Sequence, residues 1–253
     1  MKIVVCVKQV PDTAAKLTVV NGKASWGDAA LVINPWDEYA VEAALLQDDA
    51  EVVALSMGNE SALEALKHAL AMGAKDAVLI SDPVLAGADS QATAKVLAAA
   101  IRKIGGVDLV LFGRQAVDSD GGITAAQTAR ALGWPVLSLA ASVSASGGTV
   151  KVTRSMEEGQ QMVEGQLPAV ISVVKDIGEP RYPSFMGIRK ASRAQIPAWS
   201  LADLGIPAPS SVVHWPELMA PPSREVMVEM ITGGSPEEIA ATLADKILAE
   251  KVI

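Results

Sequence analysis

Apolar runs alternate with amphipathic segments from residue 2 to residue 132. Segments in which apolar residues recur at helical spacing predict helices, one beginning at 35 and others at 61–72, 90–104 and 125–132. Runs rich in Val, Ile and Leu predict buried strands at 2–7, 51–57, 76–80 and 107–112. Because strands and helices take turns along the chain, the pattern predicts a parallel sheet with helices on both faces.

Capping and turn residues mark where these elements begin and end. Asn34 is placed to cap a helix whose first position is Pro35. Gly73 follows a predicted helix, as a C-terminal glycine commonly does. Asn21-Gly22 lies at the centre of residues 17–26 and predicts a β-hairpin there.

The pattern changes after Pro135, where short β-type runs follow one another without helices between them. Tight turns such as Ser146-Gly-Gly148 join these runs. We expect them to extend the sheet in antiparallel fashion. The predicted strands are 136–143, 149–154, 161–164 and 169–174.

The last third of the chain is rich in proline and loses its periodicity. Residues 176–222 are predicted to form an extended arm. A strand is predicted at 227–231, and a final helix runs to about Lys251 from a capping box, Ser235-Pro-Glu-Glu238.

These elements predict an α/β fold with a doubly wound, mostly parallel sheet of the Rossmann-like type. An antiparallel extension and a C-terminal arm plus helix complete the predicted fold. We expect three parts: an α/β nucleotide-binding domain at 1–175, the arm at 176–222, and the terminal strand and helix at 223–253.

Charge and composition narrow the function. The net charge of −8 argues against nucleic acid or an anionic membrane as the main partner. No run of eighteen apolar residues is present, so no membrane insertion is expected. The chain opens on a predicted strand and contains a single cysteine, Cys6, so we expect a cytoplasmic protein without a metal.

The stretch from Gly113 to Thr124 lies between a predicted strand and a predicted helix. The first N–H groups of a helix have no partner within the helix, and the helix dipole favours an anion there. Gly121 and Gly122 allow close approach of a ligand, and Thr124 can cap the helix or bind a phosphate oxygen. The loop therefore predicts a nucleotide site, although it matches neither a P-loop nor a GxGxxG fingerprint.

Three further segments follow predicted parallel strands or open a helix beside them: 6–8, 34–37 and 56–58. Ligands bind beyond the carboxyl ends of parallel strands, so we expect these segments to meet the glycine loop at one edge. Asn34 can cap its helix, recognise an adenine edge, or do both. Cys6 and Met57 are either apolar walls of the site or ordinary core residues.

Several short motifs, in order over about two hundred residues, resemble the β subunit of electron transfer flavoprotein. Beyond the glycine loop they are Val4-Val-Cys-Val-Lys-Gln-Val-Pro-Asp-Thr13, Asn34-Pro-Trp-Asp-Glu-Tyr-Ala-Val-Glu-Ala-Ala44, Ala69-Leu-Ala-Met-Gly-Ala74, Val152-Thr-Arg154, Gln166-Leu-Pro-Ala-Val170 and Glu179-Pro-Arg-Tyr182. The resemblance implies a chain that binds AMP. The implied positions are Cys6, Asn34, Pro35, Trp36, Asp37, Met57, Gly113, Arg114, Gln115, Ala116, Val117, Asp118, Ser119, Asp120, Gly121, Gly122, Ile123 and Thr124.

The resemblance also implies partners. It implies a heterodimer with an α subunit that holds most of an FAD, with Thr13 and Trp36 near that flavin. Phe185, with Met186 beside it, matches the anchor for dehydrogenases, and Arg154 matches a basic residue near the mobile flavin domain. A quinone oxidoreductase is a possible electron acceptor, and residues 223–253 are implied to pack on the α subunit. No catalytic residue is expected in this chain, because the flavin carries the chemistry.

Two alternatives remain open at this stage. In the first, the chain belongs to the electron-bifurcating branch, carries its own FAD and works with NADH. Lys8-Gln-Val-Pro-Asp-Thr13 and Gly87-Ala-Asp89 resemble that branch, whereas Ser119-Asp-Gly-Gly-Ile-Thr124 departs from it. In the second, the chain is a stand-alone adenine-nucleotide-binding protein, against which the long predicted arm argues.

Overall fold

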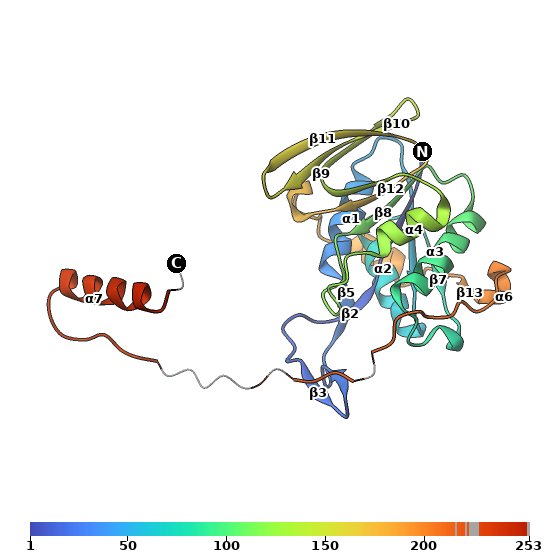
Figure 1. Ribbon diagram of the computed structural model, residues 1–253. Coiled ribbons are helices and arrows are strands. Elements are labelled where there is room, and N and C mark those ends of the chain that lie inside the picture. Colours follow the sequence, from blue (N-terminus) through green and yellow to red (C-terminus); the bar gives the residue numbers. More distant parts are fainter. Residues whose placement is uncertain (216, 221, 223–227, 252–253) are drawn as a thin grey trace. The chain divides into compact units, whose positions relative to one another are not determined.

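A computed structural model describes residues 1–253 except 216, 221, 223–227 and 252–253 (Figure 1). The chain divides into two compact units, Met1–Leu218 and Met219–Ile253. The first unit contains the α/β fold, and the described residues of the second contain one helix.

A nine-stranded sheet in the order β11-β10-β9-β12-β8-β1-β6-β7-β13 forms the centre of the first unit. Its parallel part runs from β9 to β13. Four of its strands are the apolar runs of the first 113 residues, and their burial on both faces explains their aliphatic composition. These four are β1 (Lys2–Cys6), β6 (Glu51–Met57), β7 (Asp76–Ile80) and β8 (Leu109–Gly113).

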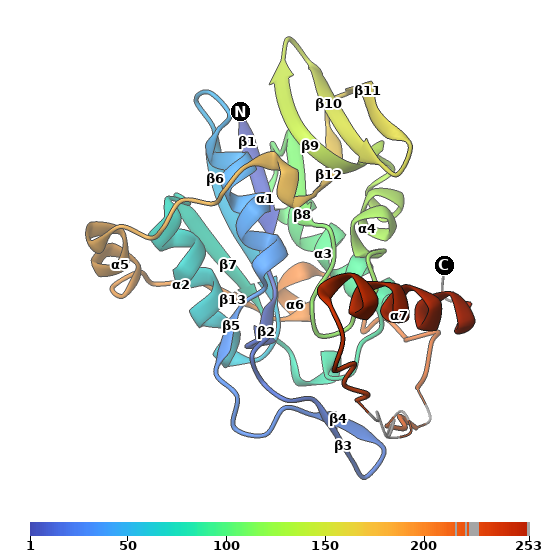
Figure 2. The same ribbon diagram turned by 90° about the vertical axis from the view of Figure 1, so that its left-hand side faces the viewer.

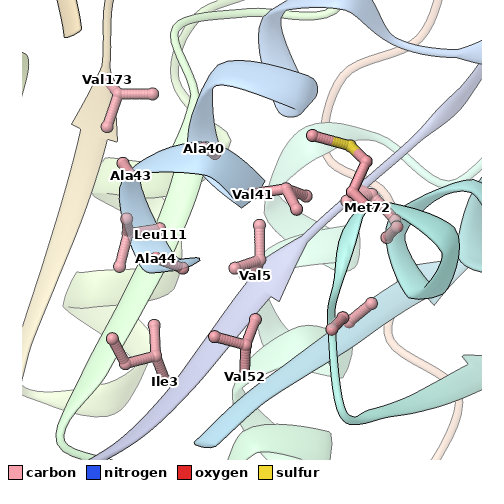
Figure 3. Close-up of a cluster of buried hydrophobic side chains, with 14 of the residues drawn as sticks. Ile3, Val5, Ala40, Val41, Ala43, Ala44, Val52, Met72, Leu111 and Val173 are labelled. Carbon is pink, nitrogen blue, oxygen red and sulfur yellow. The ribbon is translucent and has the colours of Figure 1, made fainter. Parts of the chain in front are cut away.

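Helices cover the two faces of the sheet and bury separate aliphatic clusters. Figure 2 shows α1 and α2 in front of the strands and α3 behind them. Figure 3 shows Ala40, Val41 and Ala44 of α1 facing Val5 of β1 and Leu111 of β8. The doubly wound fold is thereby confirmed. The helices are α1 (Pro35–Leu45), α2 (Leu63–Met72, after the 3-10 turn η1 at Glu60–Ala62), α3 (Ser90–Ile104, after η2 at Pro83–Leu85) and α4 (Thr124–Leu132).

Two small ladders lie beside the main sheet. The predicted hairpin is confirmed as β3 (Thr18–Val20) and β4 (Lys23–Ser25), with positive φ at Asn21 and Gly22 as a tight turn requires. Strands β2 (Gln9–Pro11) and β5 (Leu31–Ile33) pair antiparallel and bring the segment before α1 next to the end of β1.

The second half of the sheet is antiparallel only in part. Strands β9 (Val136–Ser146), β10 (Thr149–Met156) and β11 (Gly159–Gln166) form the expected antiparallel extension. Strand β12 (Ala169–Val173) instead returns into the sheet and pairs parallel with both β8 and β9. The antiparallel expectation was therefore wrong for this fully buried strand.

The extended arm predicted at 176–222 is also wrong over much of its length. Its first part contains η3 (Lys175–Ile177), α5 (Phe185–Ala191), β13 (Ala198–Trp199) and α6 (Leu201–Leu204). Strand β13 pairs with β7 as the edge of the main sheet, and Ala191 and Leu201 are buried in the two clusters. The α/β unit consequently extends well past the predicted boundary at residue 175.

The second unit contains α7 (Pro236–Ala249), opened by the predicted capping box of Ser235 and Glu238. The strand expected at 227–231 is not found over residues 228–231, and Met227 lies outside the described residues. Leu243, Ile247 and Leu248 of this helix remain partly exposed.

Candidate functional site

The carboxyl ends of β8, β1 and β6 border a cavity of about 500 Å³, here called the central cavity. The segments that we predicted to meet at this edge do so. Its lining includes the following predicted residues: Cys6, Asn34, Asp37, Met57, Gly113, Arg114, Gln115, Ala116, Ser119, Gly121, Gly122, Ile123 and Thr124. Other predicted residues are not among those that line it: Thr13, Pro35, Trp36, Val117, Asp118 and Asp120.

The buried side chain of Asn34 fixes the glycine loop. Its Nδ2 donates to the carbonyl of Gln115 at 2.8 Å, and its Oδ1 accepts from the N–H of Val117 at 3.1 Å. Its backbone N–H donates to the carbonyl of Lys8 at 2.8 Å. Asn34 occupies the cap position of α1 but makes no side-chain capping bond, so the expected capping by its side chain was wrong. The side-chain amide of Asn34 is instead used in its hydrogen bonds to Gln115 and Val117 of the loop.

Asp37 is buried beneath the loop and lines the cavity. Burial raises the pKa of its carboxyl to about 7. The backbone N–H of Lys8, 2.7 Å from Oδ2, donates to this carboxyl and acts in the opposite direction, because it lowers the pKa. A Cβ on Gly113 would lie 2.5 Å from Asp37 Oδ1 and from the carbonyl carbon of Trp36. Glycine is therefore required at 113 because α1 and the end of β8 are in direct contact.

The start of α4 presents the glycine pair to the cavity. No side chain caps this helix: the cap position is Ile123, and Thr124 is the first helical residue. The predicted cap by Thr124 was thus wrong, and the first N–H groups of α4 lack partners within the helix. A Cβ on Gly121 would meet nothing within 4 Å, and Gly122 has a φ of +64°. The chain thus leaves open space in front of a helix N-terminus, which attracts anions.

Charged side chains at the mouth of the cavity are already paired. Lys8 Nζ lies 2.7 Å from Asp118 Oδ1, and both side chains are partly exposed. Gln115 donates to Asp120, which has a positive φ. Asp118 and Asp120 therefore stabilise the loop, Asp118 through its ion pair with Lys8 and Asp120 through its hydrogen bond with Gln115.

Apolar side chains form the inner wall of the cavity. Cys6 is 6% exposed, and burial and the charge of Asp37 raise the pKa of its thiol, so the neutral form dominates near pH 7. Met57 is half-buried at the end of β6. The apolar members of the lining from the strands and α3 include Cys6, Val7, Leu55, Met57, Leu97 and Phe112.

A second cavity of about 540 Å³, here called the side cavity, borders the ends of β8 and β12. Trp36 lines it, and the guanidinium of Arg114 lies 5.8 Å from the centre of the Trp36 ring. Leu139, which has a φ of +61°, lies at an irregularity of β9 and also lines this cavity. Arg114 lines both cavities. Thr13, which the resemblance placed near the flavin, is exposed in the loop after β2 and lines neither of them.

The predicted partner residues lie on two other parts of the unit. Phe185 and Met186 are 80% and 69% exposed at the start of α5. This part of the predicted extended arm is therefore helical. Arg154 is held against the sheet: its Nε donates to the carbonyl of Ser138 at 2.9 Å and its Nη1 to Gln161 at 3.0 Å.

Sequence patterns did not indicate the residues that close the cavity on the side of α3. Ala88, Asp89, Ser90, Thr93, Val213 and Trp215 also belong to the lining. Gly87-Ala-Asp89 was noted only as a family-like motif. No local pattern relates residues 213 and 215 to a site whose other lining residues lie between 6 and 125.

Among the residues that the structure describes, no helix is both long and apolar enough to cross a membrane. They also contain no cluster of three His, Cys, Asp or Glu side chains suited to hold a metal ion.

Comparisons with known proteins agree with this architecture. A family model described as the electron transfer flavoprotein domain matches residues 28–204. The chain is 37% identical to the electron transfer flavoprotein subunit beta of Megasphaera elsdenii and 37% identical to the caffeyl-CoA reductase-Etf complex subunit CarD of Acetobacterium woodii. It is 35% identical to the acryloyl-CoA reductase electron transfer subunit gamma of Anaerotignum propionicum. Each comparison covers 100% of both chains. The chain therefore belongs to the electron transfer flavoprotein family, as a subunit of the β type.

Proposed function

We propose that this chain is the β subunit of a heterodimeric electron transfer flavoprotein and holds an adenine nucleotide, AMP, in its central cavity. In this proposal an FAD held mainly by the α subunit carries electrons between dehydrogenases and a further acceptor. The observation that carries the proposal is the central cavity, where an uncapped helix start and a glycine loop meet an apolar wall.

The loop side of the cavity suits a phosphate. The N–H groups at the start of α4 supply donors, and Gly121 leaves room for the anion to approach them. Arg114 adds positive charge to the lining, whereas the charge of Lys8 is paired with that of Asp118. The raised pKa of Asp37 reduces the negative charge that an anion would meet near pH 7.

The strand side of the cavity suits a purine base. Cys6, Leu55 and Met57 offer apolar surface, and the neutral thiol of Cys6 adds no charge. Nucleotide sites of this kind combine mostly apolar walls with a few placed polar groups. The residues present therefore fit an adenine nucleotide with its phosphate at the glycine loop and its base towards β6.

The surfaces beyond the cavity suit partners. Trp36 and Arg114 border the side cavity and are placed to contact a flavin or the α subunit. Phe185 and Met186 expose apolar side chains beside Arg189 and Lys190, which suits an acidic protein partner with an apolar pocket. When bound, the flavin supplies the redox chemistry, and this chain binds, orients and docks.

A second candidate function is a bifurcating β subunit that carries a whole FAD and works with NADH. It is favoured by Arg114, which lines both cavities, so that an extended dinucleotide could reach from one to the other. Two full-length relatives are named for CoA-thioester reductase complexes, which fits a reductase as the electron partner.

Isolation of the complex with its α subunit distinguishes these functions. The first predicts one flavin and one AMP per heterodimer, measured from the visible spectrum and by mass analysis of extracted nucleotides. The second predicts two flavins and no AMP. A stable, monomeric chain that neither binds an α subunit nor retains a nucleotide contradicts both.

A further inference from the structure

A short segment, residues 211–215, borders the central cavity through two of its residues and is here called the strap. Val213 and Trp215 of the strap line the cavity, although their side chains are 52% and 79% exposed. The side chain of Val212, between Ser211 and Val213, is 61% exposed and is not among the lining residues. Apolar packing on the core therefore contributes little to the position of the strap.

Polar bonds to a single residue hold the strap in place. Asp89 Oδ2 accepts from the N–H of Val212 at 2.7 Å and from that of Val213 at 2.9 Å. The N–H of Asp89 donates to the hydroxyl of Ser211 at 3.0 Å. The other carboxylate oxygen, Oδ1, accepts from the N–H of Ala92 at 2.7 Å and caps α3. The N–H bonds, chiefly those of Ala92 and Val213, lower the pKa of this carboxyl, so the charged acceptor persists at neutral pH.

The position of the strap in the fold indicates which part of a ligand it would meet. The glycine loop follows β8, whereas Asp89 follows β7, and β1 and β6 lie between these two strands in the sheet. The anchor of the strap therefore follows the strand next to β6, towards which the base is proposed to lie, and not β8, which the predicted phosphate site follows. The apolar lining of the cavity also includes Met57 of β6 and Leu97 of α3.

We propose that the strap, held by Asp89, forms the outer wall of the adenine end of the central cavity and controls how fast the nucleotide leaves. The inference rests on the proposed function for the nucleotide itself. Trp215 supplies an aromatic surface of the kind on which bases stack. Asp89 is a positioning residue, because it acts on the ligand through the backbone of the strap.

The two oxygens of Asp89 allow its two roles to be separated. Asp89→Asn retains one oxygen to cap α3, since asparagine is as good a cap as aspartate. It places an NH₂ group where Oδ2 accepted the two strap N–H groups, and that group cannot accept them. The variant therefore releases the strap while it leaves α3 and the glycine loop intact. Trp215→Ala removes the wall directly, and Val212→Ala is the matched control within the strap.

The test measures release of radiolabelled AMP, and separately of radiolabelled FAD, from the complete heterodimer after addition of excess unlabelled nucleotide. Asp89→Asn and Trp215→Ala are each expected to accelerate release about tenfold, as loss of one base–aromatic contact commonly does. Val212→Ala should release nucleotide at the wild-type rate, and circular dichroism in the absence of nucleotide should show that every variant remains folded.

Release at the wild-type rate from both Asp89→Asn and Trp215→Ala would overturn the strap as a wall, while the proposed function would stand. Failure of the wild-type heterodimer to retain either nucleotide would overturn both. Equal acceleration in the control Val212→Ala would show that the strap acts without a specific wall and would also overturn the inference.

Discussion

The buried carboxyl of Asp37 should make the stability of the fold depend on pH in an unusual direction. Most paired carboxylates have lowered pKa values and add stability as pH rises. Burial instead raises the pKa of Asp37 from 3.8 to about 7. Between these pH values the folded chain keeps a proton that the unfolded chain has lost, so the free energy of unfolding falls as pH rises.

The size of the effect follows from the shift. A change of one pKa unit corresponds to about 1.4 kcal/mol, so the difference from 3.8 to about 7 corresponds to about 4 kcal/mol. Asp37→Asn cannot ionise, and its oxygen can still accept the N–H of Lys8. The free energy of unfolding of the wild type, minus that of the variant, should therefore fall by about 4 kcal/mol between pH 4 and pH 8.

Urea unfolding at steps of pH, followed by circular dichroism, measures this difference. Glu42→Gln serves as the matched control because Arg181 lowers the pKa of Glu42, through a bond of 2.7 Å from Nε. For this pair the difference in the free energy of unfolding should change in the opposite direction. The wild type should become more stable relative to Glu42→Gln as pH rises from the lowered pKa of the folded state to the pKa of the unfolded state. A difference for Asp37 that is flat, or that rises with pH, would refute the reasoning.

The remaining predictions concern the partner surfaces. Phe185→Ala should slow electron exchange with the dehydrogenase partner about tenfold in stopped-flow assays. Val84→Ala, a control at another exposed apolar position, should leave the rate unchanged. Equal rates for Phe185→Ala and wild type would show that the anchor lies elsewhere. Gly187→Ala should destabilise the chain by about 2 kcal/mol, because its Cβ would lie 2.2 Å from a backbone oxygen of α2; an unchanged melting temperature would refute this packing. The α subunit at about 1,000 times its dissociation constant should stabilise the chain by about 4 kcal/mol in thermal melts. An unchanged melt would contradict the proposed heterodimer.

Elements set by local signals were predicted well from the sequence. The strand Glu51–Met57 and the helix Ser90–Ile104 have the predicted limits, because an apolar run and a helical period bounded by Asp89 and Gly105 determine them. The hairpin at Asn21-Gly22 is similarly local. The cavity edge followed from the direction of parallel strands, which places successive strand ends on one side.

Features that depend on distant partners were missed. Strand β12 pairs with β8, some sixty residues earlier, and its own turn residues do not indicate that direction. Strand β13 has only two residues and exists through its pairing with β7. The amide of Asn34 is equally suited to a cap, and only its bonds to residues 115 and 117 show which role it takes. The strap is fixed to Asp89 across more than one hundred residues.

The central claim is that the glycine loop and the start of α4 hold an adenine nucleotide. Gly121→Val tests it most directly, because Gly121 has no positive φ and a Cβ there meets no protein atom within 4 Å, so the added side chain enters open space at the cavity without strain in the fold. Ala126→Val, at an exposed position of the same helix, is the control. Native mass spectrometry of the heterodimer should show one adenine nucleotide bound to this chain in wild type and control, and none in Gly121→Val. A wild-type chain without nucleotide, or full occupancy in Gly121→Val, would contradict the claim.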